Sequence, residues 1–386
     1  MSPLDQRTAF RTSTPERGTQ TLKLQRTTRL VALLAAGSLA LTACSDDDQG
    51  GSDTAGGAET SELSGTLAGA GSSAQGAAME GWIAGFQSAN DGVTVNYDPV
   101  GSGGGREQFL AGGTDFGGSD AALDDEELVL ADERCGDGGL IEVPLYISPI
   151  AVAFNLPGVD SLNLAPEVIA GIFKQQITQW NAPEIAADNP DAELPDLAIT
   201  PVNRSDESGT TENFVEYLAA VAPDVWDFEV SGDWPVPGGE AGQGTSGVIQ
   251  ATTAAEGAIT YADASQVGDL GVAAVGVGEE FVEYSPEAAA AVVANSPRVE
   301  GRPEGSLALE IARDTTESGN YPIVLVSYQL ACKTYDDQAQ GELVRSFLEY
   351  VASEDGQAAS QESAGSAPIS DELRTDVLAQ LEQIGA

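Results

Sequence analysis

The stretch VTVNYDPVGSGGGREQFLAGG, residues 93–113, contains the signals of a strand, a tight turn and a helix in direct succession. At its start, two valines and a tyrosine alternate with polar residues, which is the pattern of a half-buried β-strand. Gly-Ser-Gly at 101–103 then provides a tight entry into the helix that we expect to follow. A strand, a glycine-rich turn and a helix in this order predict an α/β fold.

Two further stretches repeat this order. In LSGTLAGAGSSAQGAAMEGWIAGF, residues 63–86, the turn at 71–73 precedes apolar residues spaced as one face of a helix, namely Met79, Trp82, Ile83 and Phe86. In TDFGGSDAALDDEELVL, residues 114–130, Asp120 follows Gly-Gly-Ser and precedes an acidic first helical turn. The 324 residues from Leu63 to Ala386 exceed the size at which one hydrophobic core usually stops growing, so we expect two lobes.

Two apolar, β-rich stretches predict strands that cross between the lobes. They are IEVPLYISPIAVAFNLPG at 141–158 and YPIVLVSYQLACKTY at 321–335. The chain would then begin and end in the same lobe. We expect residues 63–145 and 315–386 in lobe 1 and residues 146–314 in lobe 2, with helical structure over residues 165–181 of lobe 2.

The first 43 residues predict a lipoprotein signal peptide. A basic segment leads into an uncharged run from Leu30 to Leu41, and twelve residues fall well short of the roughly 20 that a membrane-spanning helix needs. The run ends in LTAC, residues 41–44, which resembles the lipobox where bacterial signal peptidases cut and the cysteine receives a diacylglycerol. We therefore expect the mature chain to begin at Cys44 and to be lipid-anchored at the outer face of the cell membrane. The alternative is a chance cleavage site of small residues.

Residues 44–62 predict a flexible acidic tether, because they include no apolar residue larger than alanine and cannot bury a core. After residue 43 the chain holds ten Lys and Arg residues against 59 Asp and Glu residues, a formal charge of −49. So negative a chain is not expected to bind nucleic acid or anionic lipid head groups.

Cysteine counting predicts a disulfide. If Cys44 carries the lipid, Cys135 and Cys332 remain as an even pair in an oxidising compartment. The alternative is two buried thiols.

The stretch NRSDESGTTENFVEYL, residues 203–218, predicts an anion site. Its apolar spacing places the start of a helix near Thr210 or Thr211, so that residues 208–210 lie at the positive end of the helix dipole with unpaired N–H groups. Arg204 adds a planar fork that matches two oxygens of a phosphate-like ion, and Asp206 is placed to orient that fork. The alternative is a capped helix with an incidental surface ion pair.

Six blocks of the chain resemble, in family order, the substrate-binding lipoproteins of bacterial ABC-type phosphate importers. The resemblance extends over nearly all of residues 63–386. The blocks are GAGSS (69–73), VGSGGGREQF (100–109), DFGGSDAAL (115–123), IFKQQITQWN (172–181), NRSDESGTTENF (203–214) and GAITYAD (257–263).

This resemblance implies an α/β periplasmic-binding-protein fold, a two-lobed Venus flytrap with crossing strands as the hinge and phosphate enclosed in the cleft. Arg204 would be the only formal positive charge at the anion, held by Asp206, and Asp120 would accept the proton that phosphate carries. A simpler role for Asp120 is to cap a helix that begins at Ala121. The other implied donors are hydroxyl or backbone N–H groups of Ser73, Ala74, Ser102, Ser208, Gly209 and Thr210.

The resemblance also implies binding and delivery of phosphate to the membrane permease of an importer, by a monomer without cofactor or metal. The first alternative, a secreted phosphatase-like enzyme, is not expected, because a chain without histidine can form neither a Ser-His-Asp triad nor an imidazole metal site. Other tetrahedral oxyanions are the second alternative, although a buried Asp120 would repel a fully deprotonated sulfate or molybdate. An adhesion or scaffold role is the third.

Overall fold

The computed structural model describes residues 63–385, so the predicted signal peptide, Cys44 and the tether lie outside the described residues. The strands are β1 (Ser64–Gly71), β2 (Gly92–Asp98), β3 (Phe116–Ser119), β4 (Leu140–Phe154), β5 (Ser161–Leu164), β6 (Thr200–Arg204), β7 (Glu240–Gly242), β8 (Ala258–Asp263), β9 (Gly271–Val277), β10 (Glu280–Val282) and β11 (Val324–Cys332). The α-helices are α1 (Gly76–Ala89), α2 (Ser102–Leu110), α3 (Asp125–Cys135), α4 (Pro166–Phe173), α5 (Pro183–Asp188), α6 (Gly209–Val221), α7 (Gly244–Ala254), α8 (Pro286–Ala294), α9 (Gln338–Ala352), α10 (Glu354–Ala364) and α11 (Asp371–Leu381).

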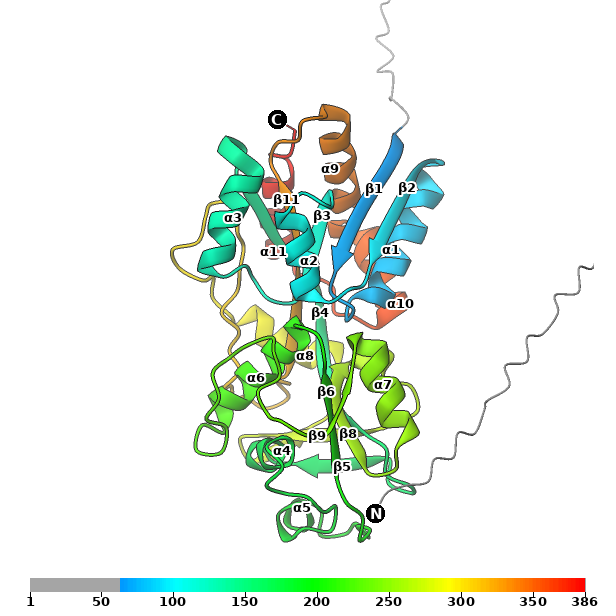
Figure 1. Cartoon of the computed structure of the whole chain (residues 1–386), viewed down its shortest axis with the longest axis vertical. Coiled ribbons are helices and arrows are strands. Elements are labelled where there is room, and N and C mark those ends of the chain that lie inside the picture. Colours follow the sequence, from blue (N-terminus) through cyan, green and yellow to red (C-terminus); the bar gives the residue numbers. More distant parts are fainter. Residues whose placement is uncertain (1–62, 386) are drawn as a thin grey trace, which may run out of the picture. The chain divides into compact units, whose positions relative to one another are not determined.

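Strand β4 connects two lobes, as the apolar run at 141–158 predicts (Figure 1). In the first lobe the strand order is β2-β1-β3-β11-β4, with β1 parallel to β2 and β3, and with β11 antiparallel to both β3 and β4. In the second lobe β4 pairs with β8 and β9, and β6 lies between β8 and β7. All residues of β4 and β11 are buried, which explains why both read as continuous apolar runs.

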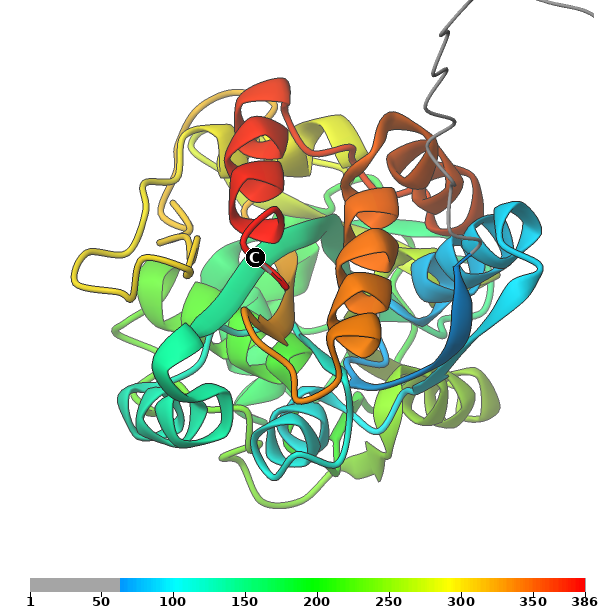
Figure 2. The ribbon, with the colours of Figure 1, turned by 90° about the horizontal axis from the view of Figure 1, so that it is seen from above.

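The two-lobed α/β prediction is therefore confirmed. The predicted boundary at 145/146 falls inside β4, and the lobe boundaries stay a prediction. Figure 2 shows α9 and α11 side by side above the strands of the first lobe, so the end of the described chain returns to the lobe in which β1 lies.

Helix α1 buries the face that its spacing predicts. Met79, Trp82 and Phe86 are buried, and Trp82 packs edge-on against Tyr146 of β4 with ring centroids 6.2 Å apart. This packing fixes the turn between β1 and α1 against the crossing strand.

One helix prediction is wrong in extent, and so is the helix start that the capping alternative for Asp120 required. Helical structure over 165–181 ends at Phe173, because Gln175 adopts a left-handed φ of 60° that an α-helix cannot continue. The helix after Asp120 begins at Asp125 rather than at Ala121. Asp124 caps it, accepting from the N–H groups of Glu126 and Glu127 in a complete capping box.

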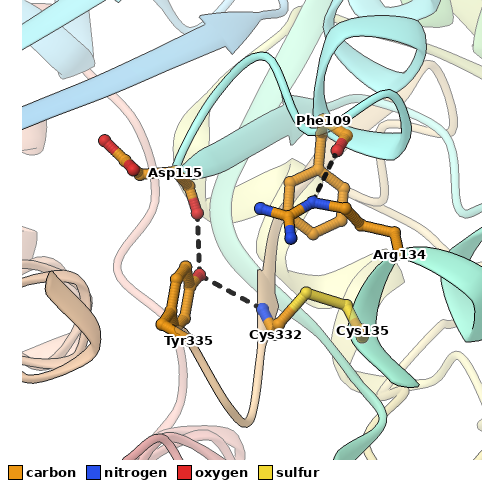
Figure 3. Close-up of a disulfide and its surroundings, with 6 residues drawn as sticks. All are labelled: Phe109, Asp115, Arg134, Cys135, Cys332 and Tyr335. Carbon is orange, nitrogen blue, oxygen red and sulfur yellow. Dashed lines mark hydrogen bonds between the residues drawn. A yellow bond between two sulfur atoms is a disulfide. The ribbon is translucent and has the colours of Figure 1, made fainter. Parts of the chain in front are cut away.

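Cys135 and Cys332 form a disulfide, with their Cα atoms 5.1 Å apart (Figure 3). It joins the end of α3 to the end of β11. The hydroxyl of Tyr335 accepts from the Cys332 N–H at 3.2 Å and donates to the Asp115 carbonyl at 2.7 Å, so the same corner also holds the start of β3.

We expect the double variant Cys135→Ala, Cys332→Ala to lose about 2–4 kcal/mol of unfolding free energy, because the bond closes a loop of 197 residues in the unfolded chain. Urea denaturation of oxidised wild type, reduced wild type and the variant measures it. Equal midpoints for all three proteins would contradict a stabilising bond.

Candidate functional site

The predicted anion-binding residues lie at the ends of strands and the starts of helices. Ser102 is the first residue of α2, and Gly209 is the first residue of α6, capped by Ser208. Asp120 directly follows β3. The first N–H groups of α2 and α6 have no partner within their own helix and lie at its positive end, which is the local condition for binding an anion.

Tertiary structure brings four of these residues into contact. The Asp120 N–H donates to the Ser102 hydroxyl at 3.1 Å, and the Thr210 hydroxyl donates to Asp120 Oδ2 at 3.2 Å. Gly209 fits between them: a Cβ atom placed on it would lie 2.7 Å from both Asp120 Cβ and Ser102 Oγ. The start of α6, in the second lobe, thus meets Ser102 and Asp120 of the first lobe without room for a side chain at Gly209.

Arg204 is buried at the end of β6 and pairs with Asp206 as predicted. Arg204 Nε donates to Asp206 Oδ1 at 2.9 Å, and Nη2 donates to Oδ2. Partial burial disfavours the Asp206 carboxylate, but the hydrogen bonds and charge of Arg204 outweigh burial and lower the pKa of Asp206. Among the described residues, Arg204 Nη1 has no hydrogen-bond partner, so one amino group remains for a ligand.

Glycines bring this ion pair close to the other groups. A Cβ atom on Gly101 would lie 2.5 Å from Asp206 Oδ2 and 3.5 Å from Arg204 Nη2, so the ion pair lies against the residue that precedes α2. On the other side, the Gly244 N–H donates to Asp206 Oδ1 at 3.0 Å. Arg204 is therefore held between the starts of α2 and α7.

The remaining predicted donors have protein partners of their own. Ser73 Oγ accepts from the Thr245 N–H at 3.0 Å, and the Ala74 N–H donates to Ser72 Oγ at 3.0 Å. Ser208 Oγ accepts from the Thr211 N–H at 3.3 Å, which is the ordinary geometry of a helix cap. Ser73 adjoins the Arg204 side of the site, because a Cβ atom on Gly244 would lie 3.6 Å from its hydroxyl.

Asp120 is almost fully buried, which raises the pKa of its carboxyl group above the ordinary value. Hydrogen bonds from Ser327, Ser72 and Thr210 oppose this rise, as does the positive charge of Arg204. The alternative role as a helix cap is wrong, since Asp124 caps α3. Asp120 is therefore a buried carboxyl group aimed at hydroxyl donors from both lobes.

Sequence reasoning missed three groups. Ser327 Oγ donates to Asp120 Oδ1 at 2.6 Å, and its signal was one serine inside the apolar run of β11. Gly244 and Thr245 belong to the segment GQGTSG, a fifth glycine and serine turn before a helix. Because these residues lie far from the other turns in the sequence, their proximity to Ser73 was not predicted.

The third is Arg106, a second buried guanidinium beside the site. It donates to Ser119 Oγ at 3.0 Å and forms ion pairs with Glu127 and Glu207. Arg204 is therefore not the only cation nearby. The charge of Arg106 is matched by two carboxylates, however, and Glu207 contributes one of them from the second lobe.

Within residues 63–385, no group of His, Cys, Asp and Glu side chains is arranged to hold a metal ion. None of the helices in the same residues is long and apolar enough to span a membrane.

The fold and the converging helix starts define a two-lobed solute-binding domain, and a family model described as a PBP superfamily domain matches residues 56–355. Phosphate-binding protein PstS 3 of Mycobacterium tuberculosis is 37% identical over 372 residues, covering 92% of this chain and 97% of that protein. PstS 2 of the same species is 35% identical over 342 residues, covering 85% and 91%. The chain belongs to the PstS family of phosphate-binding proteins.

A solved structure shares the fold. It is a high affinity periplasmic phosphate-binding protein (PfluDING) bound with phosphate, with a TM-score of 0.69, 23% identity, and coverage of 82% of this chain and 93% of that chain.

Proposed function

We propose that this protein binds inorganic phosphate outside the cytoplasm and delivers it to the membrane permease of an ABC-type importer. The observation that carries the proposal is the buried Arg204–Asp206 pair, which lies against the residue that precedes α2, with Asp120 and the start of α6 in contact nearby. The names of the two mycobacterial relatives support the same ligand.

Arg204 and the helix starts would supply the donors. Ser102 and Ser208 use their hydroxyl oxygens as acceptors within the protein, which leaves each hydroxyl proton to donate to an anion. Further donors are the hydroxyl of Ser73 and the backbone N–H groups of Ser73, Ala74, Gly209 and Thr210. The hydroxyl of Thr210 would donate to the anion in place of its bond to Asp120. Phosphate would replace Ser72 Oγ as the partner of the Ala74 N–H. Such a donor-lined, buried cage stabilises a tetrahedral oxyanion through many charge-assisted bonds.

Asp120 would select among oxyanions. Both phosphate ions present at neutral pH carry at least one P–O–H group, which can donate to a carboxylate, whereas sulfate has only acceptors. A buried acceptor that faces another acceptor costs about 1–3 kcal/mol, and more when it is charged. Asp120 would therefore favour phosphate.

Calorimetric titration of the mature protein with phosphate, sulfate and molybdate tests the proposal. We expect saturable binding of phosphate and at least a hundredfold weaker binding of the other two. Preferential binding of sulfate or molybdate would support another oxyanion as the ligand, and binding of none would leave an adhesion or scaffold role. Release of phosphate from a phosphomonoester by the purified protein would indicate the phosphatase-like alternative.

The proposal includes membrane attachment through Cys44. We expect Cys44→Ser either to release the protein from the membrane fraction or to block its maturation, because serine cannot receive a thioether-linked diacylglycerol. Fractionation of cells that express wild type or variant measures this, with Cys332→Ser as the control for loss of a cysteine. Unchanged membrane retention of Cys44→Ser would contradict lipidation.

A further inference from the structure

We propose that Ser327 is a positioning residue for anion selectivity. Its hydroxyl holds the Asp120 carboxylate in place as a hydrogen-bond acceptor for the bound anion. The inference rests on the proposed function. Ser327 does not need to touch the anion, and it acts through Asp120.

Asp120 accepts a hydroxyl hydrogen bond from Ser72, and each of its two oxygens accepts one more, from donors that lie in different lobes. Ser327 Oγ donates to Oδ1 at 2.6 Å from β11, and Thr210 Oγ1 donates to Oδ2 at 3.2 Å from the start of α6. Ser327 is fully buried and lies 207 positions from Asp120 in the sequence. These hydroxyl donors fix the orientation of the carboxyl group and favour its ionised form.

Ser327 differs from Thr210 because it shares a sheet with Asp120. Tyr328 of β11 pairs with Ser119, the last residue of β3, so Ser327 lies at the level of the residue that follows β3. The pairing of β11 with β4 shifts register between Ser327 and Tyr328, and such an irregularity changes the direction of a side chain. Donation from Ser327 therefore belongs to the first lobe alone, whereas donation from Thr210 requires contact between the lobes.

Charged and titratable groups on three other elements lie around Asp120. Arg204 on β6 contributes a favourable charge, while the phenol of Tyr97 on β2 is partly buried and neutral, because burial raises its pKa. The nearby charge of Arg106 on α2 is matched by Glu127 and Glu207. Burial raises the pKa of Asp120, whereas hydrogen bonds from Ser327, Ser72 and Thr210 lower it.

Loss of the hydrogen bond from Ser327 should change selectivity in a defined direction. Without Ser327 Oγ, Asp120 would take up a proton at higher pH. A protonated Asp120 can donate to an oxyanion, and sulfate would then no longer meet an acceptor. Phosphate can still bind, since its oxygens can accept from the same group.

The test compares wild type, Ser327→Ala and Ser327→Thr by calorimetric titration with phosphate and with sulfate between pH 5.5 and 8.5. We expect Ser327→Ala to keep phosphate affinity within about tenfold of wild type and to bind sulfate at least tenfold more tightly at pH 7. The pH below which sulfate binds should rise by about one unit, from the loss of one hydrogen bond to a charged group. Ser327→Thr retains the hydroxyl and should restore the wild-type profile.

Ser360→Ala is the matched control. Ser360 lies in α10, is equally buried, and its hydroxyl pairs with that of Ser366 at 2.6 Å rather than with Asp120. Wild-type selectivity and pH profile in Ser327→Ala would overturn the inference, as would an equal shift in Ser360→Ala. If Ser327→Ala does not fold, Ser327→Cys, with a weak donor of similar size, should shift the sulfate profile in the same direction. A wild-type profile in Ser327→Cys would equally overturn the inference. Failure of wild type to bind phosphate would instead reject the proposed function.

Discussion

We expect Arg204→Ala to bind phosphate about a hundredfold more weakly than wild type. Arg204 is buried, so its charge-assisted bonds to an anion form with little competition from water, and their loss costs on the order of 3 kcal/mol. The substitution also leaves the Asp206 carboxylate without its main partner, and that negative charge would then oppose the anion. Calorimetric titration with phosphate at pH 7 measures the change.

Arg204→Lys should recover only part of this affinity, because an ammonium group cannot bond to Asp206 with two nitrogens and still present a fork to the anion. Arg298→Ala is the matched control. Arg298 also pairs with an aspartate, Asp376, at 3.1 Å, but these side chains are 36% and 54% exposed. Arg204→Ala with wild-type phosphate affinity would remove Arg204 from the proposed site.

The second large effect concerns selectivity. We expect Asp120→Asn to reduce the preference for phosphate over sulfate by about a hundredfold, because the asparagine amide can donate to sulfate where the carboxylate could only accept. The fold should persist, since Asn has nearly the same volume and Asp124, not Asp120, caps α3. Competition titrations of both proteins with phosphate and sulfate measure the ratio.

Asp188→Asn provides the control. Asp188 accepts from the Ala165 N–H at 2.8 Å in the second lobe and contacts none of the proposed anion-binding groups. Its substitution should leave the phosphate to sulfate ratio unchanged. An unchanged ratio in Asp120→Asn as well would end the role of Asp120 as the acceptor of the phosphate proton.

Sequence reasoning predicted the local structure of the site well. The turn at 71–73 precedes α1, the Gly-Ser-Gly stretch at 101–103 leads into α2, which begins at Ser102, and the helix expected near Thr210 begins at Gly209. Arg204 and Asp206 pair as their two-residue spacing indicates. These features depend on apolar periodicity and on contacts between near neighbours, both of which can be read within a short window.

The extent of helices was predicted less well, because boundaries depend on competition between adjacent residues. Asp120 and Asp124 both precede the helical pattern of α3. Asp124 is the cap because Glu127 stands three residues later and completes the capping box. Counting to Glu127 would have identified this cap from the sequence alone.

By itself, the sequence determined the strand, turn and helix units, the even cysteine pair and the placement of an arginine before a helix start. Only the tertiary structure decided which groups meet at Asp120. Thr210 and Ser327 lie 90 and 207 positions away from it, and Ser73 meets Thr245 across 172 positions. These contacts depend on strand register and on the approach of the two lobes, and a one-residue slip in β11 would turn Ser327 to the opposite face of the sheet. Periodicity specifies which face of an element is buried, but not which distant side chain it will meet there.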